Sequence, residues 1–284
     1  MAGAEALVHG AVSIVNAIAT GKGATLGISL KTRAIVKTST GSGIVIQSKN
    51  KTISSRLITK VIQKVIPKTQ LDKFNICVSL DSEIPTGYGL KSSSAISTAV
   101  SLACTKIFKK KIDDSQILLA GVNASIESKV SITGAYDDAC GCYYGGFAVT
   151  DNYKRKIIKL EKGPTDLVAV IFIPRSRKRG NVNNLKTLSP VFEQAWNLAK
   201  NSKYWNAMIL NGLATSTILG SNQEIITELI EKGAIGASIS GNGPAIAAIV
   251  KNENVANIKK VFANLAGSTI IADINNKKAE VHDL

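Results

Sequence analysis

Residues 84–98 have the composition of an anion-binding loop. The segment reads IPTGYGLKSSSAIST, with a proline, two glycines, a lysine and three serines ahead of a run of helix formers. Residues 74–80 (FNICVSL) predict a strand before it, so a glycine turn joins this strand to a helix start. Glycines let the backbone approach a ligand closely, and the free N–H groups of a helix start face a bound anion. A nucleotide is therefore the first ligand to consider.

The loop is not a Walker A loop. That motif requires G-x-x-x-x-G-K-[ST], a spacing that no segment of this sequence has. Residues 89–92 (GLKS) are similar but lack the Gly-Lys pair. The structural alternative is a strand-to-helix turn that needs only its glycines and an N-cap serine.

A second candidate site is the pair Asp137 and Asp138, in the glycine-rich segment 133–146 (TGAYDDACGCYYGG). An aspartate beside an acceptor hydroxyl can take its proton or orient it. Adjacent side chains on an extended backbone face opposite ways, so we expect one carboxylate to reach a substrate. We expect the other to bond the backbone or a basic residue. A simple turn is the structural alternative.

Alternating helix and strand patterns surround both segments. Residues 53–66 place apolar side chains at helical spacing, and Pro67 ends this predicted helix. Further helices are predicted near 92–107, 115–129, 189–201, 204–218, 222–232 and 253–265, and strands near 24–37, 43–48, 146–150, 155–160, 166–173, 235–240 and 245–250. The mixture indicates the α+β class, and we expect two domains, 1–155 and 156–284.

Composition excludes several classes of protein. The 284 residues include no apolar run of membrane-spanning length, and no lysine or arginine precedes Lys22 as a signal peptide would require, so we expect a cytoplasmic protein without a membrane partner. Four cysteines without a C-x-x-C pair and only two histidines do not predict a zinc site of the usual spacing. The net charge of +15 would attract any anion, but aromatics are only 5% of residues, so nucleic acid is not the expected partner.

Three segments in order resemble the GHMP kinase superfamily, which includes galactokinase, homoserine kinase and mevalonate kinase. The family's central loop, P-x-G-x-G-L-x-S-S, is matched in full within residues 85–93. Residues 240–244 (SGNGP) match its C-terminal S-G-x-G-P motif, and residues 133–146 lie between the two. Within the family, the N-terminal segment and residues 133–140 (TGAYDDAC) are most similar to the archaeal type of shikimate kinase.

This resemblance implies a GHMP kinase fold, with an N-terminal half like domain 2 of ribosomal protein S5 and a ferredoxin-like C-terminal half. It implies an enzyme of aromatic amino-acid biosynthesis that uses ATP and Mg²⁺ to phosphorylate shikimate to shikimate 3-phosphate. The sequence leaves the oligomeric state open, with a homodimer as one option.

The resemblance also implies roles in phosphate and metal binding. Ser93 matches the family serine that ligates magnesium, and Glu127 resembles the glutamate that supplies a second magnesium oxygen. Spacing relative to mevalonate kinase favours Asp138 as the base, whereas the local Gly-x-x-Asp pattern favours Asp137, so both stay open. The residues implied in nucleotide binding are Pro85, Thr86, Gly87, Tyr88, Gly89, Leu90, Lys91, Ser92, Ser93, Ser94 and Ala95.

The acceptor end of the site is less defined. Ser13 and Asn16 lie in a segment that resembles the family's first motif, where hydroxyl and amide groups would bind the ring hydroxyls of the substrate. Arg175 and Arg177, from the basic run 175–179, are candidates for its carboxylate because guanidinium–carboxylate pairs are strong and directional. The structural alternative is a solvated basic loop.

Other acceptors and another class of protein are the alternatives. Homoserine kinases share the third motif but as a rule lack the Asp-Asp pair, and mevalonate kinases carry a Gly-Lys-rich first motif that is not seen in this chain. A catalytically silent binding protein of the same fold would be expected to have lost Glu127 or the pair Asp137 and Asp138, and all three are present.

Overall fold

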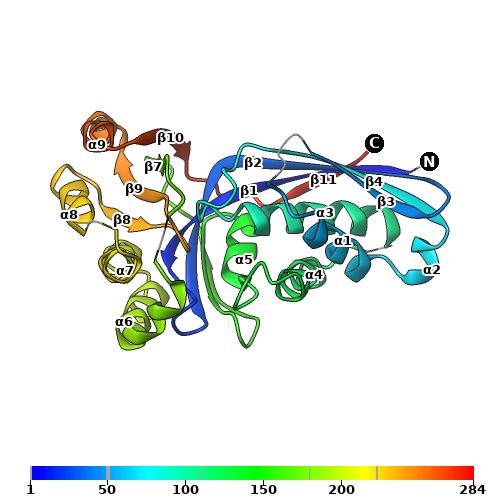
Figure 1. Cartoon of the computed structure of the whole chain (residues 1–284), viewed down its shortest axis with the longest axis horizontal. Coiled ribbons are helices and arrows are strands. Elements are labelled where there is room, and N and C mark those ends of the chain that lie inside the picture. Colours follow the sequence, from blue (N-terminus) through cyan, green and yellow to red (C-terminus); the bar gives the residue numbers. More distant parts are fainter. Residues whose placement is uncertain (1, 49–51, 110, 179, 222) are drawn as a thin grey trace.

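The computed structural model describes residues 2–48, 52–109, 111–178, 180–221 and 223–284. Their strands form a seven-stranded sheet and a four-stranded sheet, with helices packed on both, and the α+β class is confirmed (Figure 1). The larger sheet has the order β11-β1-β2-β4-β3, and β5 joins β2 to β6. The smaller sheet is antiparallel with the order β10-β7-β9-β8.

The N-terminal part supplies most of the larger sheet and the helices that cover it. Its elements are β1 (Gly3–Val15), β2 (Lys22–Thr40), β3 (Gly43–Ser48), α1 (Ser55–Val65), α2 (Lys68–Leu71), β4 (Phe74–Ser82), α3 (Ser92–Phe108), α4 (Asp114–Glu127), α5 (Tyr136–Tyr144), β5 (Phe147–Asp151) and β6 (Lys156–Glu161). Figure 1 shows α1, α3, α4 and α5 together on one face of this sheet. Helix α3 lies at their centre, and small side chains such as Ala95, Ala99 and Ala103 let it pack closely.

The C-terminal part forms the smaller sheet, its helices and the last strand of the larger sheet. Its elements are β7 (Leu167–Pro174), the 3₁₀ turn η1 (Val182–Leu188), α6 (Ser189–Lys200), α7 (Tyr204–Leu219), α8 (Gln223–Glu231), β8 (Gly236–Ile239), β9 (Ile246–Lys251), η2 (Asn252–Asn254), α9 (Val255–Ala263), β10 (Gly267–Asp273) and β11 (Glu280–Asp283). Strand β7 is buried along almost its whole length, as expected from its continuous apolar run.

Two strands that follow the expected domain boundary belong to the larger sheet. Strand β6 pairs with β5, and β11 returns to the edge of the larger sheet, where Ala4 lies opposite Asp283. Both strands fall within the expected second domain, 156–284, yet they belong to the first sheet. The two chain ends therefore lie close together (Figure 1).

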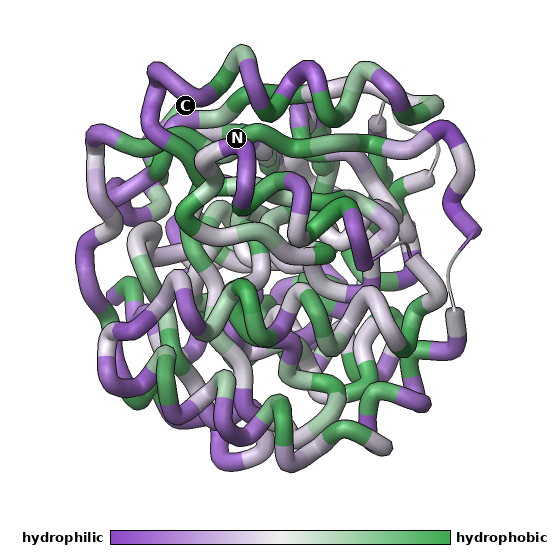
Figure 2. Tube along the Cα trace, turned by 90° about the vertical axis from the view of Figure 1, so that its left-hand side faces the viewer, coloured by the Kyte–Doolittle hydropathy of each residue, from purple (hydrophilic) through white to green (hydrophobic). Residues whose placement is uncertain are grey.

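Hydropathy changes repeatedly along the trace. Hydrophobic and hydrophilic segments alternate over most of the chain (Figure 2). Across the described ranges, no helix is both long and apolar enough to span a bilayer.

The prediction of an extended backbone at Asp137 and Asp138 is wrong. Helix α5 begins at Tyr136, so Asp137 and Asp138 occupy its first turn. Gly134 and Ala135 have φ values of 81° and 54°, and these left-handed residues turn the chain into the helix. Carboxylates in a first helical turn are favoured by the helix dipole. The two side chains therefore diverge by about 100° around a helix axis instead of facing opposite ways.

Candidate active site

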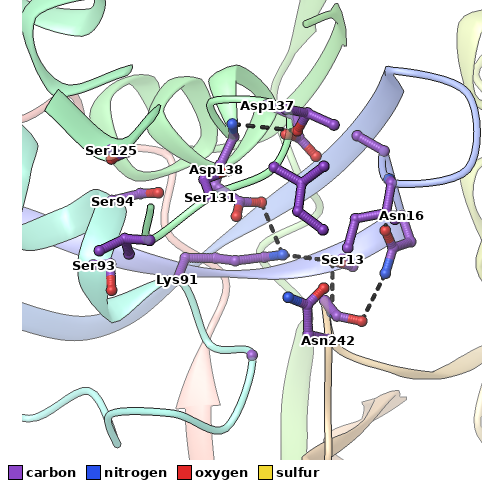
Figure 3. Close-up of a pocket in the computed structure, with 18 of the residues that line it drawn as sticks. Ser13, Asn16, Lys91, Ser93, Ser94, Ser125, Ser131, Asp137, Asp138 and Asn242 are labelled. Atoms are coloured by element: carbon purple, nitrogen blue, oxygen red, sulfur yellow. Dashed lines mark hydrogen bonds and ion pairs between the residues drawn. The ribbon is translucent and has the colours of Figure 1, made fainter. Parts of the chain in front are cut away.

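A polar pocket lies where the two halves of the chain meet. It is bounded by the glycine loop, the start of α3, the loop between α4 and α5, the start of α5, the end of β1 and the turn 240–244 (Figure 3). The polar side chains that line it are Ser13, Asn16, Lys91, Ser92, Ser93, Ser94, Ser125, Ser131, Thr133, Asp137, Asp138 and Asn242. The structure thus brings together the loop, the Asp pair and the N-terminal residues that the sequence singled out.

The glycine loop presents main-chain donors to this pocket. Gly87, Gly89 and Lys91 have φ values of 85°, 82° and 66°, and these turns lead into α3 at Ser92. The first intrahelical bond is donated by Ala95 N to Lys91 O at 2.9 Å. The N–H groups of residues 92–94 are consequently not used within the helix, and they lie at its positive end. This arrangement suits a bound phosphate.

The turn 240–244 packs directly on the glycine loop. Ser240 Oγ donates to the Gly89 carbonyl at 2.8 Å, and Ala245 N donates to the Tyr88 carbonyl at 3.2 Å. A Cβ on Gly89 would lie 1.8 Å from the Ser240 carbonyl oxygen, so only glycine fits there. Gly241 likewise lets the turn approach the loop closely, because a Cβ on Gly241 would lie 3.1 Å from Gly89 O.

We predict that Gly89→Ala lowers the free energy of unfolding by about 3 kcal/mol or more. The new Cβ would add a backbone clash to the cost of a left-handed residue, about 1–2 kcal/mol. Gly220→Ala is the matched control, since Gly220 has φ 67° and nothing within 4 Å of its Cβ position. Urea unfolding measures both. Equal losses in the two variants would show that the packing of the turn on the loop is not tight.

Lys91 has a side-chain role that the sequence analysis did not identify. Its Nζ lies 2.8 Å from Asp138 Oδ1 and donates to Ser13 Oγ at 2.7 Å (Figure 3). The side chain is 4% exposed. Burial lowers the pKa of Lys91, but the carboxylates of Asp138 and Asp137 outweigh burial and hold that pKa above its ordinary value. Lys91 is therefore a fixed cation. The sequence showed a lysine directly before a predicted helix start, and no local pattern in it indicated the partners of this lysine.

Asp137 lies deeper than Asp138. Its Oδ1 accepts a hydrogen bond from Asn152 Nδ2 at 2.7 Å, and its backbone N–H donates to Asn152 Oδ1 at 3.0 Å. A Cβ on Gly23 would lie 2.2 Å from Asp137 Oδ2, so the carboxylate packs against β2 where that strand has no side chain. Burial, and next the charge of Asp138, raise the pKa of Asp137 to about 7, against the opposing effect of Lys91. No pattern in the sequence indicated Asn152.

The raised pKa of Asp137 predicts how stability depends on pH. The folded protein keeps the proton up to about pH 7, whereas the unfolded chain loses it near 3.8. This contribution to stability is therefore present below about pH 4 and is lost as pH rises to 7. We therefore expect the Tm of Asp137→Asn, measured relative to the wild type, to rise between about pH 4 and pH 7. The exposed Asp81→Asn in β4 is the control, and a pH-independent Tm difference for Asp137→Asn would contradict the assignment.

Glu127 does not join Ser93 in this pocket, contrary to the expectation. Its carboxylate pairs with Lys64 and lies 3.8 Å from Lys60, both on α1. Ser125 lines the pocket instead. Two residues along a helix correspond to a rotation of about 200°, so a helix that turns Ser125 inward turns Glu127 outward.

Ser13 and Asn16 line the pocket, but their polar groups also hold the C-terminal turn. Ser13 Oγ accepts from Gly241 N at 2.9 Å, and Asn16 Nδ2 donates to Gly241 O at 2.7 Å. Asn16 Oδ1 accepts from Ile18 N at 2.9 Å. Their expected contact with an acceptor therefore stays a prediction, and their visible role is to join the two halves of the chain.

The basic run contacts the glycine loop through Arg177. The guanidinium of Arg177 lies over the Tyr88 ring, 5.0 Å from its centroid. Arg175 is exposed, and its backbone N–H donates to Ala266 O at 2.9 Å. Neither arginine lines the pocket, and Arg179 lies outside the described residues.

Comparisons with known proteins agree with this geometry. A family profile described as "GHMP kinases N terminal domain" matches residues 56–146, and one described as "GHMP kinases C terminal" matches residues 197–268. The shikimate kinase of Methanobrevibacter smithii is 35% identical over 277 residues, which cover 94% of this chain and 95% of that protein. The chain belongs to the GHMP kinase family.

Another relative supports the same family, and a solved structure supports the same fold. The shikimate kinase of Methanosarcina acetivorans is 36% identical over 282 residues, 97% of this GHMP kinase and 95% of its relative. A homoserine kinase from Cytophaga hutchinsonii has the same fold, with a TM-score of 0.76 at 18% identity over 99% of this chain and 97% of that one. As a GHMP kinase, the protein is an ATP-dependent phosphotransferase, and its glycine loop and Asp pair lie inside the first profile match.

Proposed function

We propose that this GHMP kinase transfers the γ-phosphoryl group of ATP to the 3-hydroxyl of shikimate, forming shikimate 3-phosphate and ADP. The observation that carries the proposal is the Lys91–Asp138 pair, which lies in the same pocket as the helix start of the glycine loop. Relatives named shikimate kinase match this chain over nearly its full length, which supports shikimate as the acceptor.

The glycine loop would hold the phosphate tail. Phosphoryl transfer depends mainly on positioning and on stabilisation of charge, with little covalent help from the protein. The main-chain N–H groups of residues 92–94 and the positive end of α3 supply fixed dipoles for this purpose. Because Gly87 and Gly89 carry no side chain, the tail can approach the backbone closely.

Asp138 is the better candidate to act on the acceptor hydroxyl. Its side chain is 19% exposed and held at Lys91, on the pocket side of α5. Asp137 is only 3% exposed, and Asn152 and β2 enclose its carboxylate. Asp138 would accept or orient the hydroxyl proton, and Lys91 would fix the carboxylate and offset negative charge during transfer.

Magnesium fits this pocket as a companion of the nucleotide. Within the described ranges, no cluster of three or more His, Cys, Asp and Glu side chains could hold a metal by itself. Mg²⁺ commonly keeps waters and binds through few protein oxygens together with substrate phosphates. The Ser93 hydroxyl at the start of α3 is the protein ligand we propose. When bound, the ion would neutralise charge on the phosphates.

We predict that Glu127→Gln leaves the Mg²⁺ dependence of turnover within about twofold of the wild type, because its carboxylate faces Lys60 and Lys64 outside the pocket. Ser93→Ala should raise the Mg²⁺ concentration needed for half-maximal rate severalfold. Initial rates across a Mg²⁺ titration at fixed ATP measure both. A selective rise for Glu127→Gln would restore the role that the sequence suggested.

A coupled ADP-release assay tests the proposed acceptor. Shikimate, homoserine and mevalonate are offered in parallel at equal ATP and Mg²⁺. We expect ADP release that depends on shikimate, with rates near background for the other two. Turnover with homoserine or mevalonate alone would replace the acceptor but keep the kinase. No ADP with any of the three would exclude these acceptors and leave only the assignment of the fold.

A further inference from the structure

Arg177 reaches the glycine loop from the other half of the chain. It follows β7 of the smaller sheet, and its guanidinium carbon lies 5.0 Å from the centroid of the Tyr88 ring. Its Nη1 lies 3.6 Å from the position that a Cβ on Gly87 would take. Gly87 itself lines the pocket. A guanidinium group therefore lies at the edge of the loop where the phosphate tail is expected.

The charge of Arg177 has no carboxylate partner within the ranges that the structure describes. Among the described residues, no carboxylate forms an ion pair with it, whereas Lys91 inside the pocket is already paired with Asp138. The main-chain N–H groups of the loop are dipoles and carry no net charge. A polyphosphate on the loop would thus find at Arg177 a cation that is not already paired with a carboxylate.

The contact with the Tyr88 ring holds the guanidinium beside the glycine loop. A planar guanidinium over an aromatic face keeps its edge N–H groups free for a planar or tetrahedral oxyanion. The Arg177 side chain contacts Tyr88 and lies beside Gly87, and both residues belong to the loop. None of them joins it to the Asp pair, beside which an acceptor hydroxyl would lie.

We propose that Arg177 binds the phosphate tail of the nucleotide on the glycine loop, and not the carboxylate of the acceptor as the sequence suggested. The inference rests on the proposed function, since it requires a nucleotide on that loop. In this proposal, the segment after β7 in the C-terminal half contacts a ligand that is bound on the N-terminal half. Arg177 then discriminates among nucleotides by the number of phosphates they carry.

Calorimetric titration of ATP, ADP and AMP into the full-length protein tests this inference. We expect Arg177→Ala to raise the Kd for ATP about tenfold or more, the Kd for ADP by less, and the Kd for AMP hardly at all. Arg177→Lys should recover part of the loss, because it keeps the charge but not the fork geometry. Arg56→Ala, at an exposed arginine of α1, controls for the loss of one positive charge.

The outcomes separate the inference from the proposed function. If the wild type binds ATP and phosphorylates shikimate but Arg177→Ala binds ATP with unchanged Kd, the inference alone is wrong. A raised KM for shikimate with unchanged nucleotide affinity would return Arg177 to the acceptor carboxylate. If the wild type binds none of the three nucleotides, both the inference and the proposed function fall.

Discussion

Replacing Asp138 by asparagine is expected to lower kcat with shikimate by a factor of about 10²–10⁴, the range typical of a lost general base. The variant keeps the size of the side chain and offers Lys91 an amide oxygen as acceptor, so the fold should persist at reduced stability. ATP affinity should stay within about threefold, because the main-chain donors of residues 92–94 are untouched. Steady-state kinetics and calorimetric ATP titration give the two values.

Two variants sharpen this prediction. Asp81→Asn removes an exposed carboxylate from β4 that does not line the pocket, and it should keep the wild-type kcat. Asp137→Asn should lose less activity than Asp138→Asn, since Asn152 and β2 enclose Asp137. If Asp137→Asn shows the larger loss, then Asp137 is the base, and the assignment from burial is reversed.

Replacing Lys91 by methionine is expected to reduce both stability and turnover. The substitution leaves Asp138 beside the buried Asp137 without its cation, and breaking a buried ion pair typically costs about 3–5 kcal/mol. Turnover should fall by at least as much as in Asp138→Asn, because the carboxylate loses its fixed position and the pocket loses a positive charge. Urea unfolding and initial rates measure the two effects.

The double variant Lys91→Met/Asp138→Asn separates these effects. Removing the unpaired carboxylate should restore much of the lost stability but none of the turnover. Lys106→Met, within α3, is the control, since its partner Asp283 is 75% exposed and the pair should contribute at most about 1 kcal/mol. A loss in Lys91→Met no larger than in Lys106→Met would show that the buried pair does not form.

Much of the site could be predicted because its phosphate end is local in sequence. The strand, the glycine turn and the start of α3 are consecutive, and their residue types fix the left-handed turns directly. The amphipathic helix α1 could be predicted equally well, because its buried residues recur at helical spacing. Contacts within one short segment need no knowledge of the rest of the chain.

The remaining features depend on contacts between distant segments. Helix α5 contains cysteines, glycine and aromatics that are weak helix formers, and it forms because its Gly141 lets it approach Thr25 of β2. The contacts of Lys91 with Ser13, and of Asp137 with Asn152, join residues that no local pattern relates. Glu127 is different, because the helical phase relative to Ser125 could have placed it outside the pocket.

A crystal structure with shikimate and a non-hydrolysable ATP analogue tests the account most directly. We expect the phosphate tail on the main-chain N–H groups between Pro85 and Ala95, and the 3-hydroxyl of shikimate about 2.6–3.2 Å from the Asp138 carboxylate. A phosphate tail bound elsewhere, or a 3-hydroxyl out of reach of both Asp137 and Asp138, would contradict the account.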